Sequence, residues 1–144
     1  MTTALIYTDA YTGFDYGPEH PLRMERLGLT WRLMQAYGLT TLPDMMLCAP
    51  EPADETAIAA YHTQPFIDTL KAADTGLEPP GAALFGLGPG DNPVFPGLWK
   101  VARLVAGGSL LAADLVGSGR SSARSTSPAV SITPWRTARP ASAT

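Results

Sequence analysis

The chain has 144 residues, of which 45% are hydrophobic and 16% charged, with a formal net charge of −3 at pH 7. This composition excludes a disordered chain, and the lack of any apolar run near the roughly 20 residues that cross a bilayer excludes a membrane span. The lone Cys48 cannot form an intramolecular disulfide and the N-terminus lacks the pattern of a signal peptide, so we expect a cytoplasmic protein with no membrane partner.

The first elements in chain order are a strand, a long helix and a second strand. The apolar run Ala4–Tyr7 predicts a buried strand because it is too short for a helix. After a loop rich in Gly, Pro, Asp and Tyr, apolar residues recur at helical spacing and predict an amphipathic helix over Leu22–Tyr37, which ends at Gly38. Met45–Ala49, bounded by prolines, predicts the second strand.

Three helices and a long loop follow. Asp54 predicts the cap of a short helix, and Thr63 with a proline two positions later predicts the start of the next. Residues 76–97 are expected to be a loop, of a length that is usually functional or mobile. Leu98–Val116 predicts a second long helix, whose adjacent Gly107 and Gly108 indicate close packing against a neighbouring element.

The alternation of strands and helices predicts an α/β fold with a parallel sheet. Only two strands are visible, whereas a parallel sheet needs more strands and helices on both of its faces. We therefore expect the N-terminal part of a larger domain, poorly soluble when isolated because apolar edges and faces are left open.

The chain changes character near residue 117, so the expected boundaries are 1–117 and 118–144. The second segment contains four arginines and no acidic residue, and it lacks any helical or strand period. Such a segment is typical of a disordered tail, or of an arm for nucleic acid or an acidic partner.

Few residues suggest chemistry of their own. His20 and His62 lie far apart, and no His or Cys pair has the spacing of metal ligands, so no metal site is expected in this chain. The glycine-rich residues 86–90 lack the preceding strand and the Gly-Lys-Ser/Thr of a phosphate loop. Asp15, Glu19 and His20 offer an acid/base cluster, although a turn-rich loop predicts the same residues without catalysis.

Three segments carry a resemblance to a known family. They are YGPEHPLRMERLGLTWRLMQAYGL (residues 16–39), AYHTQPFIDTLKAA (60–73) and GPGDNPVFPGLWKVARLVAGGSLLAADLV (88–116). In this order they are similar to the first third of the zinc-dependent histone deacetylase superfamily, with the bacterial acetoin utilization type as the closest branch. The resemblance implies an arginase/deacetylase-like domain of three layers around a parallel sheet, incomplete here. It also implies an activity in which zinc polarises an acetyl-amide carbonyl and activates a water.

The resemblance implies roles for five residues. Asp91 matches the rim aspartate that accepts hydrogen bonds from the substrate backbone, with capping of the following helix as the alternative. Tyr16 and His20 would border the substrate tunnel and bind substrate. Arg26 matches the arginine of an internal cavity through which acetate leaves, with a solvated helix face as the alternative, and Arg23 matches a neighbouring basic position.

No catalytic residue and no metal ligand is carried over by the resemblance. The family's His-His pair, its Asp-x-His and later Asp that hold zinc, and its transition-state Tyr all lie downstream of the third segment. The cofactor expected of the full-length family is zinc, and the chain as printed is expected to be inactive because it lacks these residues.

The genetic code offers an explanation for residues 118–144. Read one base earlier, the codons of residues 124–143 permit F-N-[FLIV]-A-G-G-L-H-H-A-M-A-D-R-A-S-G-F-C, which contains the family's His-His segment without a gap. We therefore interpret this tail as out-of-frame translation, from a frameshift or a sequencing error.

Three readings of the function follow. The first is a truncated deacetylase whose full-length form hydrolyses acetyl-lysine or a small acetylated amine, with no direct nucleic-acid partner. The second is a non-catalytic binding or regulatory protein derived from the same fold. The third is a metal-independent hydrolase built on Asp15, Glu19 and His20.

Overall fold

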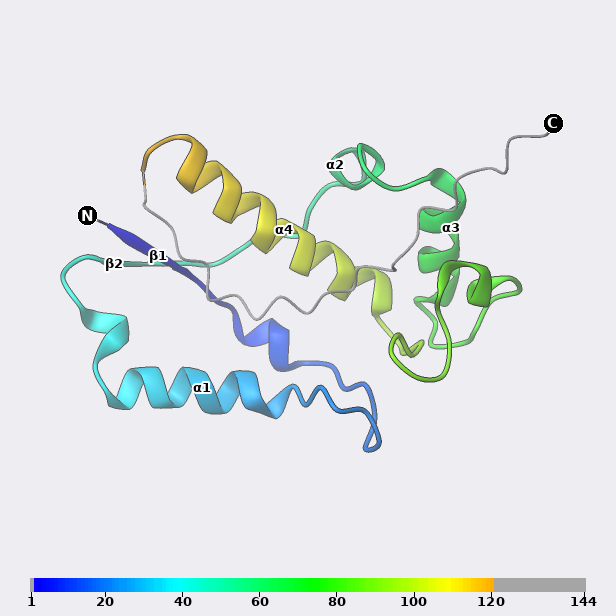
Figure 1. The fold of residues 1–144 in the computed structure, drawn as a ribbon, viewed down its shortest axis with the longest axis horizontal. Helices are drawn as coiled ribbons and strands as arrows, with labels where there is room; N and C mark the ends of the chain where they lie inside the picture. The colour runs from blue at the N-terminus through cyan, green and yellow to red at the C-terminus, as the bar shows by residue number, and fades with distance from the viewer. Residues whose placement is uncertain (1, 121–144) are drawn as a thin grey trace.

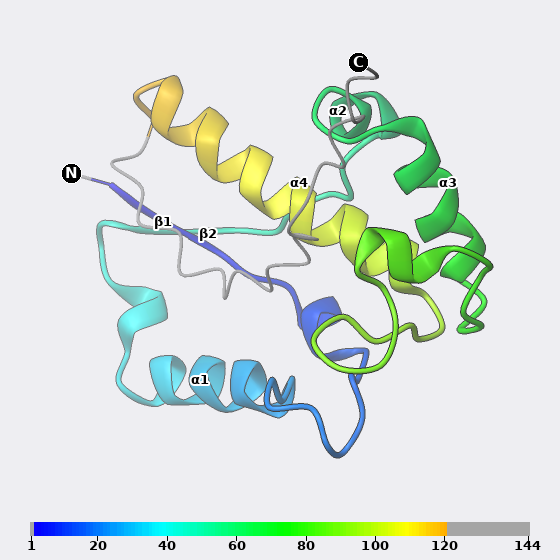
Figure 2. The ribbon, with the colours of Figure 1, turned by 45° about the vertical axis from the view of Figure 1, so that its right-hand side comes forward.

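Two parallel strands lie between two long helices, as Figures 1 and 2 show from two directions for the computed structural model, which describes residues 2–120. Strand β1 (Thr3–Ile6) pairs with β2 (Met45–Cys48), in a register that aligns Thr3 with Met45. Helix α1 (Glu25–Ala36) covers one side and α4 (Leu98–Gly117) the other. The predicted α/β class with a parallel sheet is confirmed, and the described residues hold only these two strands of it.

The strand predictions are correct to within one residue at each end. Ile6 ends β1, but the N–H of Tyr7 still donates to the carbonyl of Cys48 at 3.0 Å, so the pairing continues one residue further. The Tyr7 ring then stacks on Trp31 of α1, with ring centroids 4.1 Å apart. This contact ties the end of the strand to the helix layer.

Helix α1 begins three residues later than the sequence predicts. Residues 20–23 are irregular instead: the N–H of Leu22 donates to Nδ1 of His20 at 3.1 Å, and Met24 takes the N-cap position. The predicted end is confirmed, because Gly38 adopts a left-handed φ of 69° just after the helix. Leu27 packs inward, whereas several other apolar residues of α1 face solvent.

Two shorter helices follow the second strand. The Asp54 carboxylate accepts a hydrogen bond from the N–H of Ala57 at 2.7 Å and caps α2 (Glu55–Ala59), as predicted. Helix α3 (Gln64–Ala73) begins after Thr63, with a proline in its first turn. Its Phe66, Ile67 and Leu70 are buried. Three single 3-10 turns complete the described elements: η1 (Asp9–Thr12), η2 (Leu39–Thr41) and η3 (Ala82–Phe85).

Close packing at the two glycines of α4 is confirmed. A Cβ atom on Gly107 would overlap the carbonyl oxygen of Glu51 and lie 2.9 Å from the nitrogen of Ala53, and one on Gly108 would meet the hydroxyl of Tyr11. The absence of side chains lets α4 lie directly against the chain that links β2 to α2. Two hydrogen bonds hold this contact, from the N–H of Ala53 to Arg103 O at 2.9 Å and from Arg103 Nε to Ala53 O at 2.7 Å.

The long loop 76–97 is anchored in the largest apolar cluster. Ala82, Leu87 and Phe95 of the loop are buried against Leu70 of α3 and Leu98 of α4. Burial of side chains from three points along the loop fixes its path across the end of the helices. None of the described helices is both long and apolar enough to cross a membrane.

Candidate functional site

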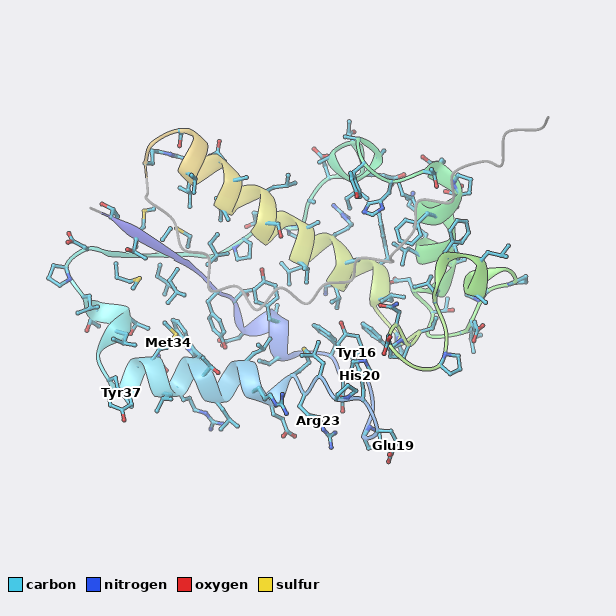
Figure 3. The ribbon with its side chains drawn as sticks, in the orientation of Figure 1. Tyr16, Glu19, His20, Arg23, Met34 and Tyr37 are labelled. Atoms are coloured by element: carbon cyan, nitrogen blue, oxygen red, sulfur yellow. The ribbon has the colours of Figure 1, made fainter. Side chains whose placement is uncertain are left out.

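An aromatic cluster joins two loops that are far apart in the sequence. Phe14 stacks on Phe95 with ring centroids 5.3 Å apart, and Tyr16 meets the edge of the same ring at 5.4 Å. His20 lies 4.6 Å from the ring of Tyr16, and Figure 3 shows these two side chains together at the end of the molecule where α1 begins. The loop before α1 and the loop before α4 therefore form one surface.

His20 bridges the two loops through Nε2, while Nδ1 forms a contact within its own loop. Nδ1 accepts a hydrogen bond from the N–H of Leu22 at 3.1 Å, and Nε2 lies 3.3 Å from the backbone oxygen of Asp91. A carbonyl oxygen only accepts, so Nε2 must carry a proton to donate to Asp91; Nδ1 lies 3.1 Å from the N–H of Leu22 and 3.4 Å from its carbonyl oxygen. The Nε2–H group of His20 thus holds the Asp91 loop against the loop of residues 13–22.

Asp91 lies at the tip of a closed loop. Asn92 closes that loop from within, since its backbone oxygen accepts from the N–H of Gly88 at 2.9 Å and its side-chain amide donates to Gly86 O at 3.2 Å. The Asp91 side chain is exposed, and within the described residues its carboxylate makes no hydrogen bond or ion pair. An ionised carboxylate in this position is available to accept N–H groups from a bound molecule.

The alternative that Asp91 caps α4 is wrong. Asp74, at the end of α3, supplies the cap: its Oδ1 accepts from the N–H of Trp99 at 2.8 Å and of Lys100 at 3.4 Å. A further hydrogen bond, from the N–H of Gly97 to the backbone oxygen of Asp74 at 2.9 Å, holds the start of α4 beside the end of α3. Asp91 therefore does not cap α4.

Burial changes the pKa of Tyr16, which belongs to this surface, and of His62, which packs at the start of α3. It raises the pKa of the Tyr16 hydroxyl to about 12, so Tyr16 is neutral at physiological pH. It lowers the pKa of His62, which lies half-buried against Phe66 with ring centroids 4.9 Å apart. His62 also meets the ring of Tyr61 edge-on, at 4.9 Å, so its contacts are with residues just before and within α3.

The two predicted cavity arginines both face solvent in the part of the chain that the structure describes. Arg23 lines a hollow of about 410 Å³ between residues 12–15 and the first turn of α1, together with Asp15, Glu25 and Arg32. Arg26 lies on the exposed side of α1 and does not line this hollow. The solvated-face alternative therefore describes Arg26 in the described chain.

The structure does not assemble the acid/base cluster of Asp15, Glu19 and His20. Asp15 Oδ1 accepts from the N–H of Gly17 at 3.0 Å, as in a simple turn, and Glu19 is exposed (Figure 3). Both nitrogens of His20 are engaged elsewhere. Among the described residues there is also no group of three His, Cys, Asp or Glu side chains that could hold a metal ion.

Sequence reasoning missed Phe14, Phe95 and Asp74. The two phenylalanines hold the loops together, yet each stands in a polar, glycine-rich segment without periodicity, so only the fold shows that they meet. No local signal marks Asp74, because the N–H groups that its side chain accepts from belong to Trp99 and Lys100, 25 and 26 residues further along the chain.

Comparison with known proteins gives a consistent family match. The family model described as "Histone deacetylase domain" matches residues 20–131. The acetoin utilization protein AcuC of Bacillus subtilis is 34% identical over 119 residues, which cover 82% of this chain and 30% of that protein. Histone deacetylase B of Dictyostelium discoideum is 35% identical over 97 residues, covering 66% of this chain and 22% of that protein.

Solved structures agree with the sequence matches. The crystal structure of an HDAC homologue from Aquifex aeolicus superimposes with a TM-score of 0.73 at 26% identity, covering 87% of this chain and 33% of that one. An HDAC homologue complexed with SAHA gives a TM-score of 0.74 at 26% identity, with the same coverage. The chain thus spans about a third or less of the length of the relatives that it matches.

Proposed function

The chain belongs to the histone deacetylase domain family, and from this premise we propose that it is the N-terminal part of a zinc-dependent deacetylase of the acetoin utilization branch. The full-length form would hydrolyse the amide bond of acetyl-lysine or of a small acetylated amine in the cytoplasm. Water would add to the acetyl carbon as the C–N bond breaks, which yields acetate and the free amine. The alternative is a non-catalytic binding or regulatory protein that retains this part of the fold.

The observation that carries the proposal is the contact between the two loops. The family resemblance assigns Tyr16, His20 and Asp91 to one substrate-binding rim, and these residues lie together although 71 positions separate His20 from Asp91. Asp91 presents an exposed carboxylate, and an ionised carboxylate that accepts two N–H groups orients a substrate backbone well. A rim built in this way supports substrate binding at this end of the domain.

Within the rim, we assign different tasks to the three residues. Asp91 would contact substrate directly. His20 would hold Asp91 in place through its Nε2–H, and the neutral Tyr16 would pack against His20 and complete the tunnel border. Arg26 and Arg23 would belong to the internal cavity of the complete domain.

The described residues do not fit a zinc ion. They contain no cluster of three potential ligands, so none of the tasks assigned to the rim residues involves zinc. In the proposed full-length enzyme the ligands and the general base would come from the part of the domain that follows the matched third. We further propose that residues 118–144 are out-of-frame translation, because the frame one base earlier permits the His-His segment of the family.

Two experiments test this proposal. The first is to sequence the coding DNA from codon 110 onward: an open alternative frame that encodes the His-His and Asp-x-His elements supports it, and a closed frame contradicts the out-of-frame interpretation. The second is a hybrid protein in which residues 1–117 replace the corresponding part of B. subtilis AcuC. We expect zinc-dependent release of acetate from acetyl-lysine peptides or small acetylated amines by the hybrid, and none by the 144-residue chain. A folded, zinc-loaded hybrid without activity would favour the non-catalytic alternative.

A further inference from the structure

The loop that carries Asp91 is closed at its base. Thr75 and Pro96, at its two ends, pair as an isolated antiparallel bridge. Gly76 has a left-handed φ of 85°, and a Cβ added to it would lie 2.7 Å from two carbons of the Pro96 ring. We call Thr75, Gly76 and Pro96 the neck of the loop. Contacts this close fix the distance between the two ends of the loop.

Asp74 ties the chain before the neck to the chain after it. It is the C-cap of α3, and its backbone oxygen accepts from the N–H of Gly97 at 2.9 Å. Its Oδ1 accepts from the N–H of Trp99 at 2.8 Å and from that of Lys100 at 3.4 Å. One residue therefore joins the end of α3 to the start of α4 through both its backbone and its side chain.

The first turn of α4 depends on this carboxylate. Gly97 holds the N-cap position with a left-handed φ of 84° and has no side chain with which to cap the helix. The first N–H groups of a helix lack partners within the helix and carry partial positive charge, so an ionised carboxylate binds them strongly. In the part of the chain that the structure describes, Asp74 fills this role from a different helix.

The start of α4 in turn sets the position of Phe95. The N–H of Leu98 donates to the carbonyl oxygen of Phe95 at 3.2 Å, and both side chains are buried in the same apolar cluster. The ring of Phe95 is the one on which Phe14 stacks and which Tyr16 meets edge-on. A shift of the first turn of α4 would therefore move the centre of the aromatic cluster.

The same shift reaches Asp91 by two routes. Asp91 lies four residues before Phe95 in the loop, and its backbone oxygen accepts from Nε2 of His20, which packs on Tyr16. The tip of the loop is thus held by His20, and its base by Asp74. Misplacement of a substrate-positioning group by about 1 Å can cost about 100-fold in activity, so the position of the base matters for binding at the tip.

We propose that Asp74 is a positioning residue for the substrate: it clamps the first turn of α4 to the end of α3 and so fixes the loop that presents the Asp91 carboxylate. Asp74 does not touch the substrate and acts through Asp91. This inference rests on the proposed function, because it takes Asp91 as the group that binds substrate. A cap that only stabilised α4 would change the free energy of unfolding without acting through Asp91.

A double-mutant cycle in the AcuC hybrid tests the proposal, with an acetyl-lysine peptide as the substrate. We expect Asp74→Ala to lower kcat/KM about 5-fold or more in the parent hybrid, and less than about 2-fold in a hybrid that already carries Asp91→Ala, since groups that act together are not additive. Asp54→Ala is the matched control. Asp54 caps α2 through a hydrogen bond of 2.7 Å from the N–H of Ala57, outside the loop, and its loss should leave kcat/KM unchanged.

Amide hydrogen exchange tests the clamp without relying on activity. Residues 76–97 of the hybrid should exchange at least about 10-fold faster in Asp74→Ala, because local opening of the loop becomes easier. In Asp54→Ala the faster exchange should be confined to α2 and its flanking residues. An inactive hybrid in which Asp74→Ala loosens residues 76–97 contradicts the proposed function and leaves the clamp intact.

Asp74→Asn covers the case in which Asp74→Ala does not fold. Its neutral amide oxygen accepts the same hydrogen bonds more weakly, so kcat/KM should fall about 2-fold, and again not in the Asp91→Ala background. Three results would overturn the proposal. They are an equal loss of kcat/KM with and without the Asp91 carboxylate, an equal loss in Asp54→Ala, and unchanged exchange of residues 76–97 when Asp74 is replaced.

Discussion

Substitution of Gly107 by alanine tests the closest contact in the fold. In an open helix this change stabilises by about 1 kcal/mol, because alanine loses less backbone entropy than glycine. Here the new Cβ would overlap the carbonyl oxygen of Glu51, so α4 must move away from residues 51–53. That movement strains the two hydrogen bonds between Ala53 and Arg103, each worth about 1 kcal/mol, and adds an overpacking cost of about 1–3 kcal/mol.

The balance predicts that Gly107→Ala lowers the free energy of unfolding by about 2–4 kcal/mol, since the strain exceeds the gain in helix propensity. Gly117→Ala is the matched control, because nothing lies within 4 Å of a Cβ there, and it should be neutral or stabilising by up to about 1 kcal/mol. Urea unfolding of the AcuC hybrid, followed by tryptophan fluorescence and circular dichroism, measures the stability of both variants. Equal or higher stability of Gly107→Ala would refute the reasoning about close packing.

The other predictions concern the rim and the pH dependence of folding. In the AcuC hybrid, Asp91→Asn should reduce kcat/KM about 10-fold or more with little change in melting temperature, because the charge serves substrate rather than α4; a larger loss of stability than of activity would contradict this. Nitrogen-15 NMR at pH 8 should show His20 as the neutral Nε2–H tautomer, and a Nδ1–H signal would contradict the bridge. Burial lowers the pKa of His62, so the folded protein takes up its proton less readily than the unfolded chain. The stability that neutral His62 contributes is therefore present above its ordinary pKa of 6.5 and is lost as the pH falls. The midpoint of urea unfolding should drop in acid less steeply for His62→Gln than for the parent protein. Because burial raises the pKa of Tyr16 to about 12, absorbance at high pH should show a late-ionising tyrosine that is absent in Tyr16→Phe. The stability that Tyr16 contributes should fall as the pH rises from 10 toward 12.

The sequence by itself determined the elements and the family. The spacing of apolar residues and the positions of glycine and proline located β1, α1, β2 and α4 to within a few residues, because these signals are local. The caps at Asp54 and Gly38 were also readable, since a side chain or a left-handed glycine ends a helix by contacts a few residues away. The order of three motif segments was enough to indicate the deacetylase family, which the family model confirms.

Only the tertiary structure decided which distant residues meet. No periodicity links Phe14 to Phe95 or His20 to Asp91, because both pairs join irregular loops whose paths depend on packing of α3 and α4. The same holds for the use of Asp74 rather than Asp91 as the cap of α4. The same is true of helix α1, which carries apolar residues on two faces. The sequence does not distinguish them, and only the fold shows that Leu27 is buried while Leu29 and Leu33 are exposed, because burial depends on the neighbouring elements.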